Sequence, residues 1–194
     1  MRFAGDWKDV GTWNTMAEVM AEPAKGHVIM DETCANTNIV NELDIPILAM
    51  GCKDLIIAAG CDGILVAEKE RSSQMKPYVE KLDEEIRYAE KSWGSYTVID
   101  SGKESLTIKV HLTAGSRMKY HSHQNREEIW TVLDGVGRVV LEGVEMIVTP
   151  GSVVNIRRGQ KHQLIAESDM HVVEVQVGKD ISKADKETFE SPVK

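Results

Sequence analysis

The sequence contains, at Gly115–Gly135, the stretch GSRMKYHSHQNREEIWTVLDG. His121 and His123 are two residues apart in it, so on a β-strand both side chains leave the same face. Glu128 follows after four further residues, and a glycine closes the stretch at an expected turn. A second stretch, GSVVNIRRGQKH, ends about forty residues downstream at His162. Three imidazoles and one carboxylate at these spacings predict two hairpins of a small antiparallel barrel that hold one divalent metal ion, for which Zn, Fe, Mn, Co and Ni are all suitable.

The carboxylate ligand is open between two neighbours, Glu127 and Glu128. Glu128 is preferred because period-two alternation puts it on the same strand face as Trp130 and Val132. A single histidine on a strand is more often a packed or surface residue than a ligand, so the prediction depends on the joint spacing. The remaining histidines lack that spacing and are assigned structural roles: His27, His111 and His171.

Composition bounds the class of protein. A chain of 194 residues with 42% hydrophobic residues is long and apolar enough to fold around a core. The three cysteines form no CxxC pair and no apolar run reaches the length of a membrane span, so we expect a soluble, cytoplasmic protein with reduced thiols. The formal net charge of −8 disfavours nucleic acid and anionic membranes as partners.

The charge is unevenly distributed along the chain. Residues 1–92 hold ten Lys and Arg against seventeen Asp and Glu, so the acidity belongs to this part. Basic residues gather in sequence around the expected ligands, although several of them are expected only to solvate the hairpins. A cationic mouth over a metal site would suit a phosphorylated or carboxylated small molecule. These basic residues are Lys109, Arg117, Lys119, Arg126, Arg157, Arg158 and Lys161.

The chain divides into three segments with different sequence patterns. Residues 1–92 carry short apolar runs bounded by Gly, Asn, Asp or Pro, which predict short strands, and they end in an expected linker helix over residues 74–91. Residues 93–178 show strand patterns every eight to ten residues, which predict a sandwich or a small barrel. Residues 179–194 are polar and are expected to form either a mobile tail or a short helix packed on the barrel.

At the histidine motifs the chain resembles the cupin superfamily. The matching positions are Gly115, His121, His123, Glu128 and Gly135 in the first motif, and Gly151, Gly159 and His162 in the second. Arg157 stands where the pattern usually has proline, and Ala166 where it often has asparagine, changes that concern turn geometry more than metal binding. The resemblance implies a mainly β fold. We expect a cupin barrel (a double-stranded β-helix, or jelly roll) preceded by a small strand-rich lobe that ends in the linker helix.

A narrower resemblance covers about residues 6–178. Four runs occur in one order: WKDVGTWNT at Trp7–Thr15, CKDLIIAAGCDGILVAEKERSSQMKPYVEKL at Cys52–Leu82, KSWGSY at Lys91–Tyr96 and VEVQVG at Val173–Gly178. This order is similar to the C-terminal portion of the bifunctional mannose-1-phosphate guanylyltransferase/mannose-6-phosphate isomerases, the type II phosphomannose isomerases. In that family a sugar nucleotidyltransferase domain precedes a cupin isomerase domain. Residues 1–92 therefore resemble the last lobe of the transferase.

Parts of the family pattern are absent. No glycine-rich, phosphate-cradling loop occurs, so guanylyltransferase activity is not expected from this chain alone. Asp9 matches a position where such transferases hold Mg²⁺, but one carboxylate cannot bind and activate a nucleotide, and Asp9 is interpreted as a remnant. The family's acidic stretch and arginine after the last strand are replaced by KDISKADKETFE, which puts a substrate contact from that stretch in doubt. Whether Met1 starts the natural protein stays open.

The resemblance implies a metal-dependent isomerase that interconverts mannose 6-phosphate and fructose 6-phosphate. Its metal ligands would be His121, His123, Glu128 and His162. Glu174 and Lys109 are the candidates for the base that moves a proton between C1 and C2. Arg157 is the first candidate for contact with the phosphate or the enediolate. Lys119 and Arg126 follow it as candidates for substrate binding.

Other interpretations of the sequence stay open. The cupin domain could bind a sugar phosphate without catalysis, or be the stable remnant of a bifunctional protein. It could also belong to a split guanylyltransferase, with a separate nucleotidyltransferase fragment as partner. An exposed barrel edge predicts a homodimer through strand pairing. The sequence does not fix which metal is bound or which sugar is recognised.

Overall fold

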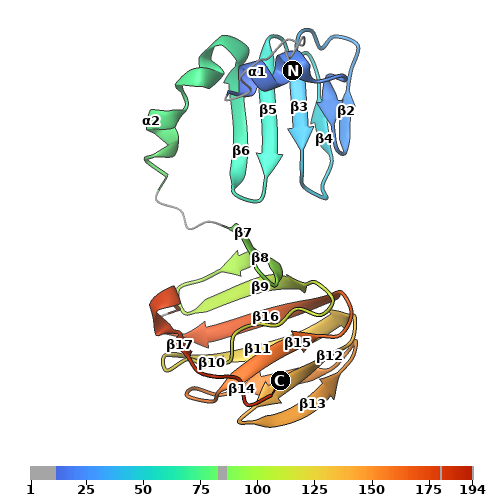
Figure 1. Ribbon diagram of the computed structural model, residues 1–194. Helices are drawn as coiled ribbons and strands as arrows, with labels where there is room; N and C mark the ends of the chain where they lie inside the picture. The colour runs from blue at the N-terminus through green and yellow to red at the C-terminus, as the bar shows by residue number, and fades with distance from the viewer. Residues whose placement is uncertain (1–11, 83–86, 180, 194) are drawn as a thin grey trace, which may run out of the picture. The chain divides into compact units, whose positions relative to one another are not determined.

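The computed structural model describes residues 12–82, 87–179 and 181–193. The chain divides into two compact units, residues 1–85 and 86–194, each of which is described by itself (Figure 1). Asp9 lies outside the described residues. Within them, none of the helices has the length and apolar character needed to cross a membrane.

The first unit consists mainly of short strands stacked in parallel. β1, β3 and β5 pair in parallel, β6 adds an antiparallel edge, and β2 and β4 form a separate parallel pair. Ile39 and Ile56 are buried inside these rungs, which gives the unit a solenoid-like core. The strands are β1 (Ala24–Lys25), β2 (Val28–Met30), β3 (Asn38–Asn41), β4 (Ile47–Ala49), β5 (Leu55–Gly60) and β6 (Gly63–Glu68).

Short helices flank the strands of the first unit. α1 (Trp13–Val19) begins at Thr12, which forms a reciprocal capping box with Thr15. The short 3₁₀-helix η1 (Lys69–Gln74) and α2 (Lys76–Val79) follow β6.

The long linker helix predicted over residues 74–91 is wrong. The helical turn ends at Val79, and β7 (Tyr88–Lys91) pairs instead with β8 of the second unit. Pairing with a neighbouring strand outweighs the helical pattern of apolar and charged residues there. This pairing also puts the division of the chain before residue 88, earlier than the boundary expected at residue 92.

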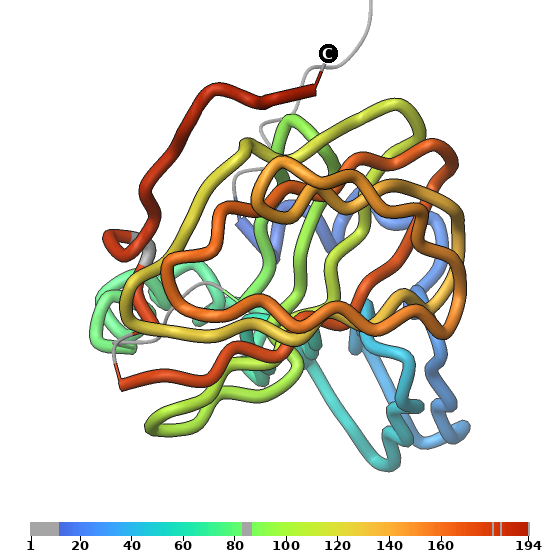
Figure 2. Tube along the Cα trace, turned by 90° about the horizontal axis from the view of Figure 1, so that it is seen from below, coloured from blue at the N-terminus to red at the C-terminus, as the bar shows by residue number. Residues whose placement is uncertain are grey.

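The second unit is a two-sheet antiparallel barrel. One sheet has the order β14-β11-β16-β9-β8-β7, and the other has the order β13-β12-β15-β10-β17. Its strands are β7 (Tyr88–Lys91), β8 (Gly94–Ser101), β9 (Ser105–Leu112), β10 (His121–Ser122), β11 (Arg126–Asp134), β12 (Gly137–Leu141), β13 (Val144–Val148), β14 (Val153–Ile156), β15 (His162–Ala166), β16 (Met170–Gly178) and β17 (Glu187–Thr188), with the 3₁₀-helix η2 (Lys183–Asp185) before β17. This arrangement confirms the predicted mainly β, cupin-type jelly roll, and Figure 2 shows its two walls facing each other.

The barrel core lies between the two sheets. Leu112, Trp130, Leu164 and Met170 are among its fully buried side chains. Alternation along each strand sends one set of side chains into this core and the other set outward. At one end of the barrel the inward set becomes polar, and this is where the predicted ligands lie.

Gly135 shows why a turn residue of the first motif must be glycine. Its φ is +80°, and a Cβ there would lie 2.3 Å from the carbonyl oxygen of Asp169. A side chain would therefore be strained by the backbone conformation and would clash with the neighbouring chain. The glycine lets β11 turn into β12 directly beneath β16.

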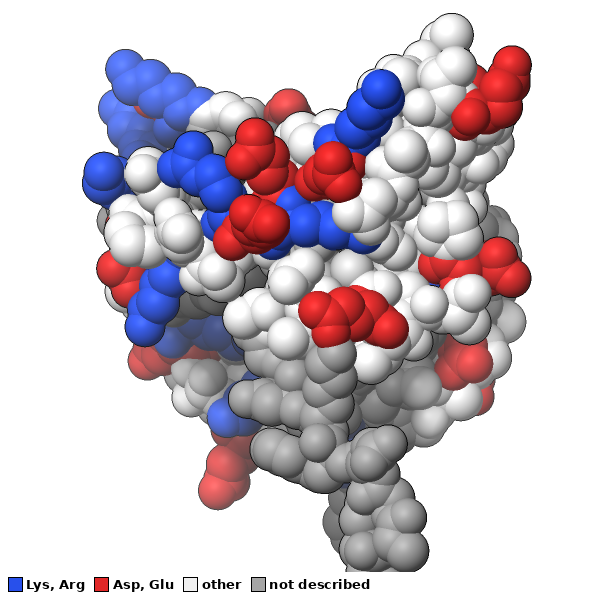
Figure 3. Space-filling view, turned by 90° about the horizontal axis from the view of Figure 1, so that it is seen from above, with Lys and Arg blue, Asp and Glu red and all other residues white. Residues whose placement is uncertain are grey.

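The view in Figure 3 shows the charges on one face. Lys and Arg side chains are interspersed with Asp and Glu side chains, and no broad basic surface covers the part of that face that is described.

Candidate metal centre

The two histidine motifs meet where β10 pairs with β15. His121 and His162 are direct register partners, so their side chains leave the same face and their ring centroids are 4.3 Å apart. His123 joins them, with its ring centroid 4.8 Å from that of His121. All three are buried, and their ligand atoms lie within 4.8 Å of one another.

Backbone carbonyls orient the three imidazoles. The Nδ1 atoms of His121, His123 and His162 lie 2.6, 2.7 and 2.9 Å from the carbonyl oxygens of Lys119, Asp185 and Gln160, respectively. A carbonyl can only accept a hydrogen bond, so each Nδ1 carries the proton and each Nε2 of the neutral ring has a lone pair. The lone pair of His123 faces Arg126, while the Nε2 atom of His162 has no hydrogen-bond partner among the described residues.

His121 and His123 are uncharged in this environment. Burial, followed by repulsion from His162, lowers the pKa of His121 to about 2. Burial also lowers the pKa of His123. Neutral imidazole is the form that binds metal ions, so no proton has to be removed from these two rings near neutral pH.

Glu128 is the candidate for a fourth ligand atom. Its Oε1 is 3.1 Å from Nε2 of His123, and its Oε2 is 3.4 Å from Nε2 of His162. Burial opposes its ionisation, but His162, His123 and Arg126 outweigh burial and lower its pKa below the usual range. Glu127, the alternative ligand, is exposed on the opposite strand face.

The Nε2 atom of His162 tests whether a cation fits. His162 is fully buried, and this Nε2 has no hydrogen-bond partner among the described residues. An ionised carboxylate beside unprotonated nitrogens is repulsive unless a positive charge lies between them. The four residues therefore fit a bound divalent metal ion.

Arg126 supplies part of that positive charge from inside the barrel. Its Nε donates to Oε1 of Glu128 at 3.0 Å, and one terminal nitrogen lies 3.0 Å from Nε2 of His123. The other terminal nitrogen donates to the carbonyl of Ser182 at 3.1 Å. Arg126 was predicted to bind substrate, but the structure places it against two of the metal ligands. Trp130 completes this layer by donating from Nε1 to Oε2 of Glu128 at 3.1 Å.

Glu174 lies beside the ligands on β16. It is the register partner of Trp130 and is buried, and Nε2 of Gln176 donates to its Oε1 at 2.5 Å. Burial, then repulsion from Glu128, raises the pKa of Glu174 to about 8. A carboxyl group with a pKa near neutrality can both take and return a proton at physiological pH.

Two of the other predicted residues point away from this site. Lys109 is exposed on β9, where Ile108 and Val110 are the buried neighbours and Ile108, not Lys109, is the register partner of Glu174. It cannot be the base, because it lies on the outer face of the sheet. Arg157 is exposed in the turn after β14, and its described hydrogen bond, from its backbone N–H to Gln160, does not join its guanidinium to the site.

Lys119 has a divided role. Its carbonyl orients His121, while the residue itself is exposed and its charge acts on Lys186.

Sequence reasoning missed the contribution of residues 179–194. The carbonyl of Asp185 orients His123, and the Asp185 carboxylate accepts from the backbone N–H groups of Gln124 and Asn125. β17 pairs with β10, so the expected polar tail takes part in the barrel wall. No pattern in the sequence indicates this pairing, because β17 is two residues long and about sixty residues from its partner.

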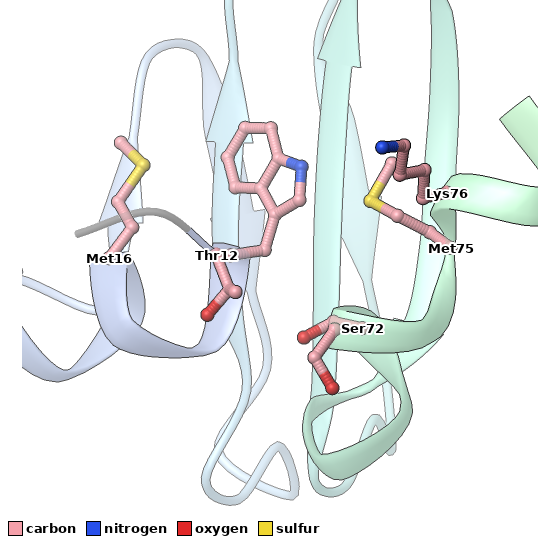
Figure 4. A pocket seen from close by; sticks show the side chains of 7 residues that line it. Thr12, Met16, Ser72, Met75 and Lys76 are labelled. Atoms are coloured by element: carbon pink, nitrogen blue, oxygen red, sulfur yellow. The ribbon is translucent and has the colours of Figure 1, made fainter. Parts of the chain in front are cut away.

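A separate cavity lies in the first unit between α1 and η1 (Figure 4). Its volume is about 410 Å³, and Trp13, Met16, Met75 and Lys76 contribute to its wall. Of the described residues that line it, only Lys76 is charged, and none is a histidine, cysteine or carboxylate. This lining therefore offers no set of metal ligands.

Comparison with known proteins places the barrel in a family. The sequence profile described as Mannose-6-phosphate isomerase C-terminal matches residues 80–191, which is more than half of the chain. The chain belongs to this family. The match covers residues 80–191, so it contains the four candidate ligands and also Asp185, whose carbonyl lies against His123.

The chain is also similar to longer bacterial proteins. Mannose-1-phosphate guanylyltransferase ManC of Salmonella typhimurium is 25% identical over 197 residues, which cover 95% of this chain and 41% of that protein. Alginate biosynthesis protein AlgA of Pseudomonas aeruginosa is 24% identical, with 95% and 41% covered. RfbM of Salmonella typhimurium, also named mannose-1-phosphate guanylyltransferase, is 32% identical over 69% of this chain and 30% of its own length. The chain thus spans about two fifths of the length of the first two relatives.

Solved structures with a similar chain course have low sequence identity. A double-stranded β-helix protein from Klebsiella pneumoniae has a TM-score of 0.44 and 20% identity over 48% of this chain and 82% of its own. An RmlC-like cupin from Shewanella frigidimarina has a TM-score of 0.43 and 15% identity, covering 46% and 81%.

Proposed function

We propose that this chain is a metal-dependent aldose–ketose isomerase that interconverts mannose 6-phosphate and fructose 6-phosphate. The observation that supports this most is the pairing of two different groups in one buried site. One is a set of neutral imidazoles and an ionised carboxylate suited to a divalent cation, and the other is the Glu174 carboxyl group with its raised pKa. The family match and the names of the longer relatives favour mannose phosphates as the substrate class.

The ligands would be His121, His123, Glu128 and His162, and a divalent ion held by them would polarise the substrate oxygens as a Lewis acid. Glu174, as carboxylate, takes the proton from C2 of the aldose and returns it to C1 to give the ketose. Gln176 fixes the Glu174 carboxyl group, and Arg126 with Trp130 fixes that of Glu128. The assay below determines which metal supports turnover and whether mannose 6-phosphate is a substrate.

The assay measures conversion of mannose 6-phosphate by protein loaded with Zn, Mn, Fe, Co or Ni, and by the same protein after chelation. We expect turnover with at least one metal and its loss with chelator. His162→Ala should lower kcat/KM by more than about 100-fold, since removing only an outer partner of a ligand costs about 10- to 100-fold in metal affinity or activity. His171→Ala is the matched control, because His171 lies outside the site and pairs with Asp134 at the surface.

The outcomes separate catalysis from binding. Equal activity of His162→Ala and wild type would contradict the role of the metal centre. Metal-loaded protein that binds mannose 6-phosphate but converts no hexose phosphate would replace the isomerase with a sugar-phosphate-binding module.

A second function follows from the length of the relatives. Proteins named guanylyltransferases extend well beyond the region that this chain covers, so the chain could complete a guanylyltransferase together with a separate nucleotidyltransferase fragment. Formation of GDP-mannose from GTP and mannose 1-phosphate only after such a fragment is added would support it.

We also propose a homodimer, on the argument that barrel edges pair. Light scattering coupled to size-exclusion chromatography would show one species of twice the chain mass, and a monomer at all concentrations would exclude it.

A further inference from the structure

The C-terminal segment, residues 182–193, runs around the barrel (Figure 2), and its β17 adds an edge strand to the sheet beside β10. The backbone N–H of Phe189 donates to the carbonyl of Tyr120 at 2.8 Å, and their rings pack edge to face. Ser191 donates to Oε1 of Gln163 at 2.7 Å, and Val193 packs on the cluster of Tyr120, Val140 and Ile165. These contacts fix the segment in one register.

That register directs Lys186 toward the metal centre. Glu187 is opposite Ser122, and Thr188 is opposite His121. Partners in an antiparallel pair share a face, and alternate residues along an extended chain do too. Lys186 has extended backbone angles, φ −110° and ψ 109°, so its side chain leaves on the same face as Thr188 and His121. Glu187 leaves on the other face, with Ser122.

Electrostatics agree with this placement. Burial lowers the pKa of Lys186, and attraction by Glu174 and then Glu128 opposes that shift. The positive charge of Lys186 also acts on His121. The residue as a whole is exposed, as expected at a rim.

We propose that Lys186 is a catalytic residue that exchanges protons with the O1 and O2 atoms of the substrate, while Glu174 exchanges protons with C1 and C2. This inference rests on the proposed isomerase. It adds a group that neither motif contains and that comes from the C-terminal segment. An isomerase of this kind needs an acid for the carbonyl oxygen as well as a base for carbon. Among the described residues, two cations act on Glu174, and of these Arg126 already donates to Glu128, whereas Lys186 leaves the strand on the face of His121.

Protons and electrons balance in two steps. First, Glu174 takes the proton from C2, the C2–H pair forms the C1=C2 bond, the C1=O1 π pair moves to O1, and Lys186 gives O1 a proton. Second, Lys186 takes the proton from the O2 hydroxyl, that O–H pair forms C2=O2, and the C1=C2 π pair takes the proton from Glu174 at C1. Both side chains end in their starting protonation states, so no further reactant is needed.

The test compares Lys186→Met, Lys186→Arg and Lys186→Ala with wild type. Lys186→Met should lower kcat for mannose 6-phosphate by about 100-fold or more, which is within the usual range for general acid–base catalysis, while KM and metal content change little. Ethylamine added to Lys186→Ala should restore part of kcat in a concentration-dependent manner, which a structural role would not produce. Lys186→Arg should stay slow, because a guanidinium does not give up its proton.

Two controls separate charge and anchoring from chemistry. Glu187→Gln changes the neighbour on the opposite face and should keep wild-type kcat. Lys161→Met removes the ammonium that lies 4.0 Å from the Phe189 ring and so weakens the anchor, without removing a group from the site.

Each result decides the inference. Wild-type turnover with an unimpaired Lys186→Met would overturn the role of Lys186 and leave the isomerase intact. Loss of kcat in Lys186→Met without amine rescue of Lys186→Ala would also overturn it. If wild type converts no hexose phosphate, the isomerase fails independently. In that case, binding of a sugar-phosphate hydroxamate, which mimics the enediolate, tests Lys186. About tenfold weaker binding to Lys186→Met than to wild type would support Lys186 as a contact of the oxyanion. Equal binding to both proteins would overturn that role.

Discussion

The two units bury polar side chains for different purposes. Among the described residues, nine of the twelve buried polar side chains lie in the second unit, and every buried ionisable one does. In the first unit, Asn41 is typical: its amide donates to the carbonyls of His27 and Ile45 and thereby ties neighbouring turns together. In the second unit the buried polar groups also bond to one another: Arg126 and Trp130 donate to Glu128, and Gln176 donates to Glu174. Buried polarity supports the fold in one unit and holds reactive groups in the other.

The largest effect should come from leaving one buried charge unpaired. Arg126→Met removes the guanidinium from Glu128 and should destabilise the second unit by about 3 kcal/mol in metal-free protein, because an uncompensated buried carboxylate remains. Urea unfolding with chelator present measures this change. Arg138→Met is the control, since Arg138 pairs with Glu145 and Glu167 at the surface. This variant should lose much less stability. Equal losses for the two variants would break the distinction between the buried network and surface pairs.

Glu174 should make the stability of the second unit depend on pH. Its folded pKa of about 8 lies above its ordinary value of 4.5, so the stability it contributes is present below pH 4.5 and is lost as pH rises toward 8. Glu174→Gln does not titrate. The free energy of unfolding of Glu174→Gln, relative to that of metal-free wild type, should therefore increase with pH. The increase should be at most about 1.4 kcal/mol per pH unit between pH 5 and 8. Unfolding curves at several pH values in chelator test this, and a constant difference would show that Glu174 is ionised throughout.

In the first unit, the matching change is purely structural. Asn41→Leu leaves two carbonyls and the N–H of Leu43 without their partner, at a cost of about 2 kcal/mol. Hydrogen exchange of β3 and β5 would report the loss. The metal dissociation constant should stay that of wild type, and a parallel fall in metal affinity would mean that the two units are energetically coupled.

The smallest expected effect concerns a partner of a ligand. Trp130→Phe keeps a ring in the core but removes the donor to Oε2 of Glu128, and should weaken metal binding by about tenfold. Competition with a chromophoric chelator measures it. Unchanged affinity would show that Arg126 alone positions Glu128.

The metal centre was more predictable than its surroundings. Spacing of two along a strand and the facing hairpins were enough to bring His121, His123, Glu128 and His162 together, because period-two alternation is a local property. Local alternation also distinguishes the exposed Lys109 from its buried neighbours Ile108 and Val110. The same alternation therefore separates the two candidate bases, Lys109 and Glu174.

What the sequence did not reveal depends on pairing between distant segments. The helical pattern of residues 74–91 gave way at residues 88–91 to pairing with β8, and the role of Asp185 and Lys186 depends on a two-residue strand that joins β10. Neither register is encoded within its own segment, since each depends on the neighbour that is available.

The hydrogen bonds between β17 and β10 have a practical consequence for anyone who shortens this gene. A stop codon placed after Gly178 would leave every sequence motif in place, yet the product would have lost the carbonyl that holds His123 and would present the bare edge of β10 to other molecules. Such a truncation would be expected to aggregate during purification, and an affinity tag is better fused to the other terminus.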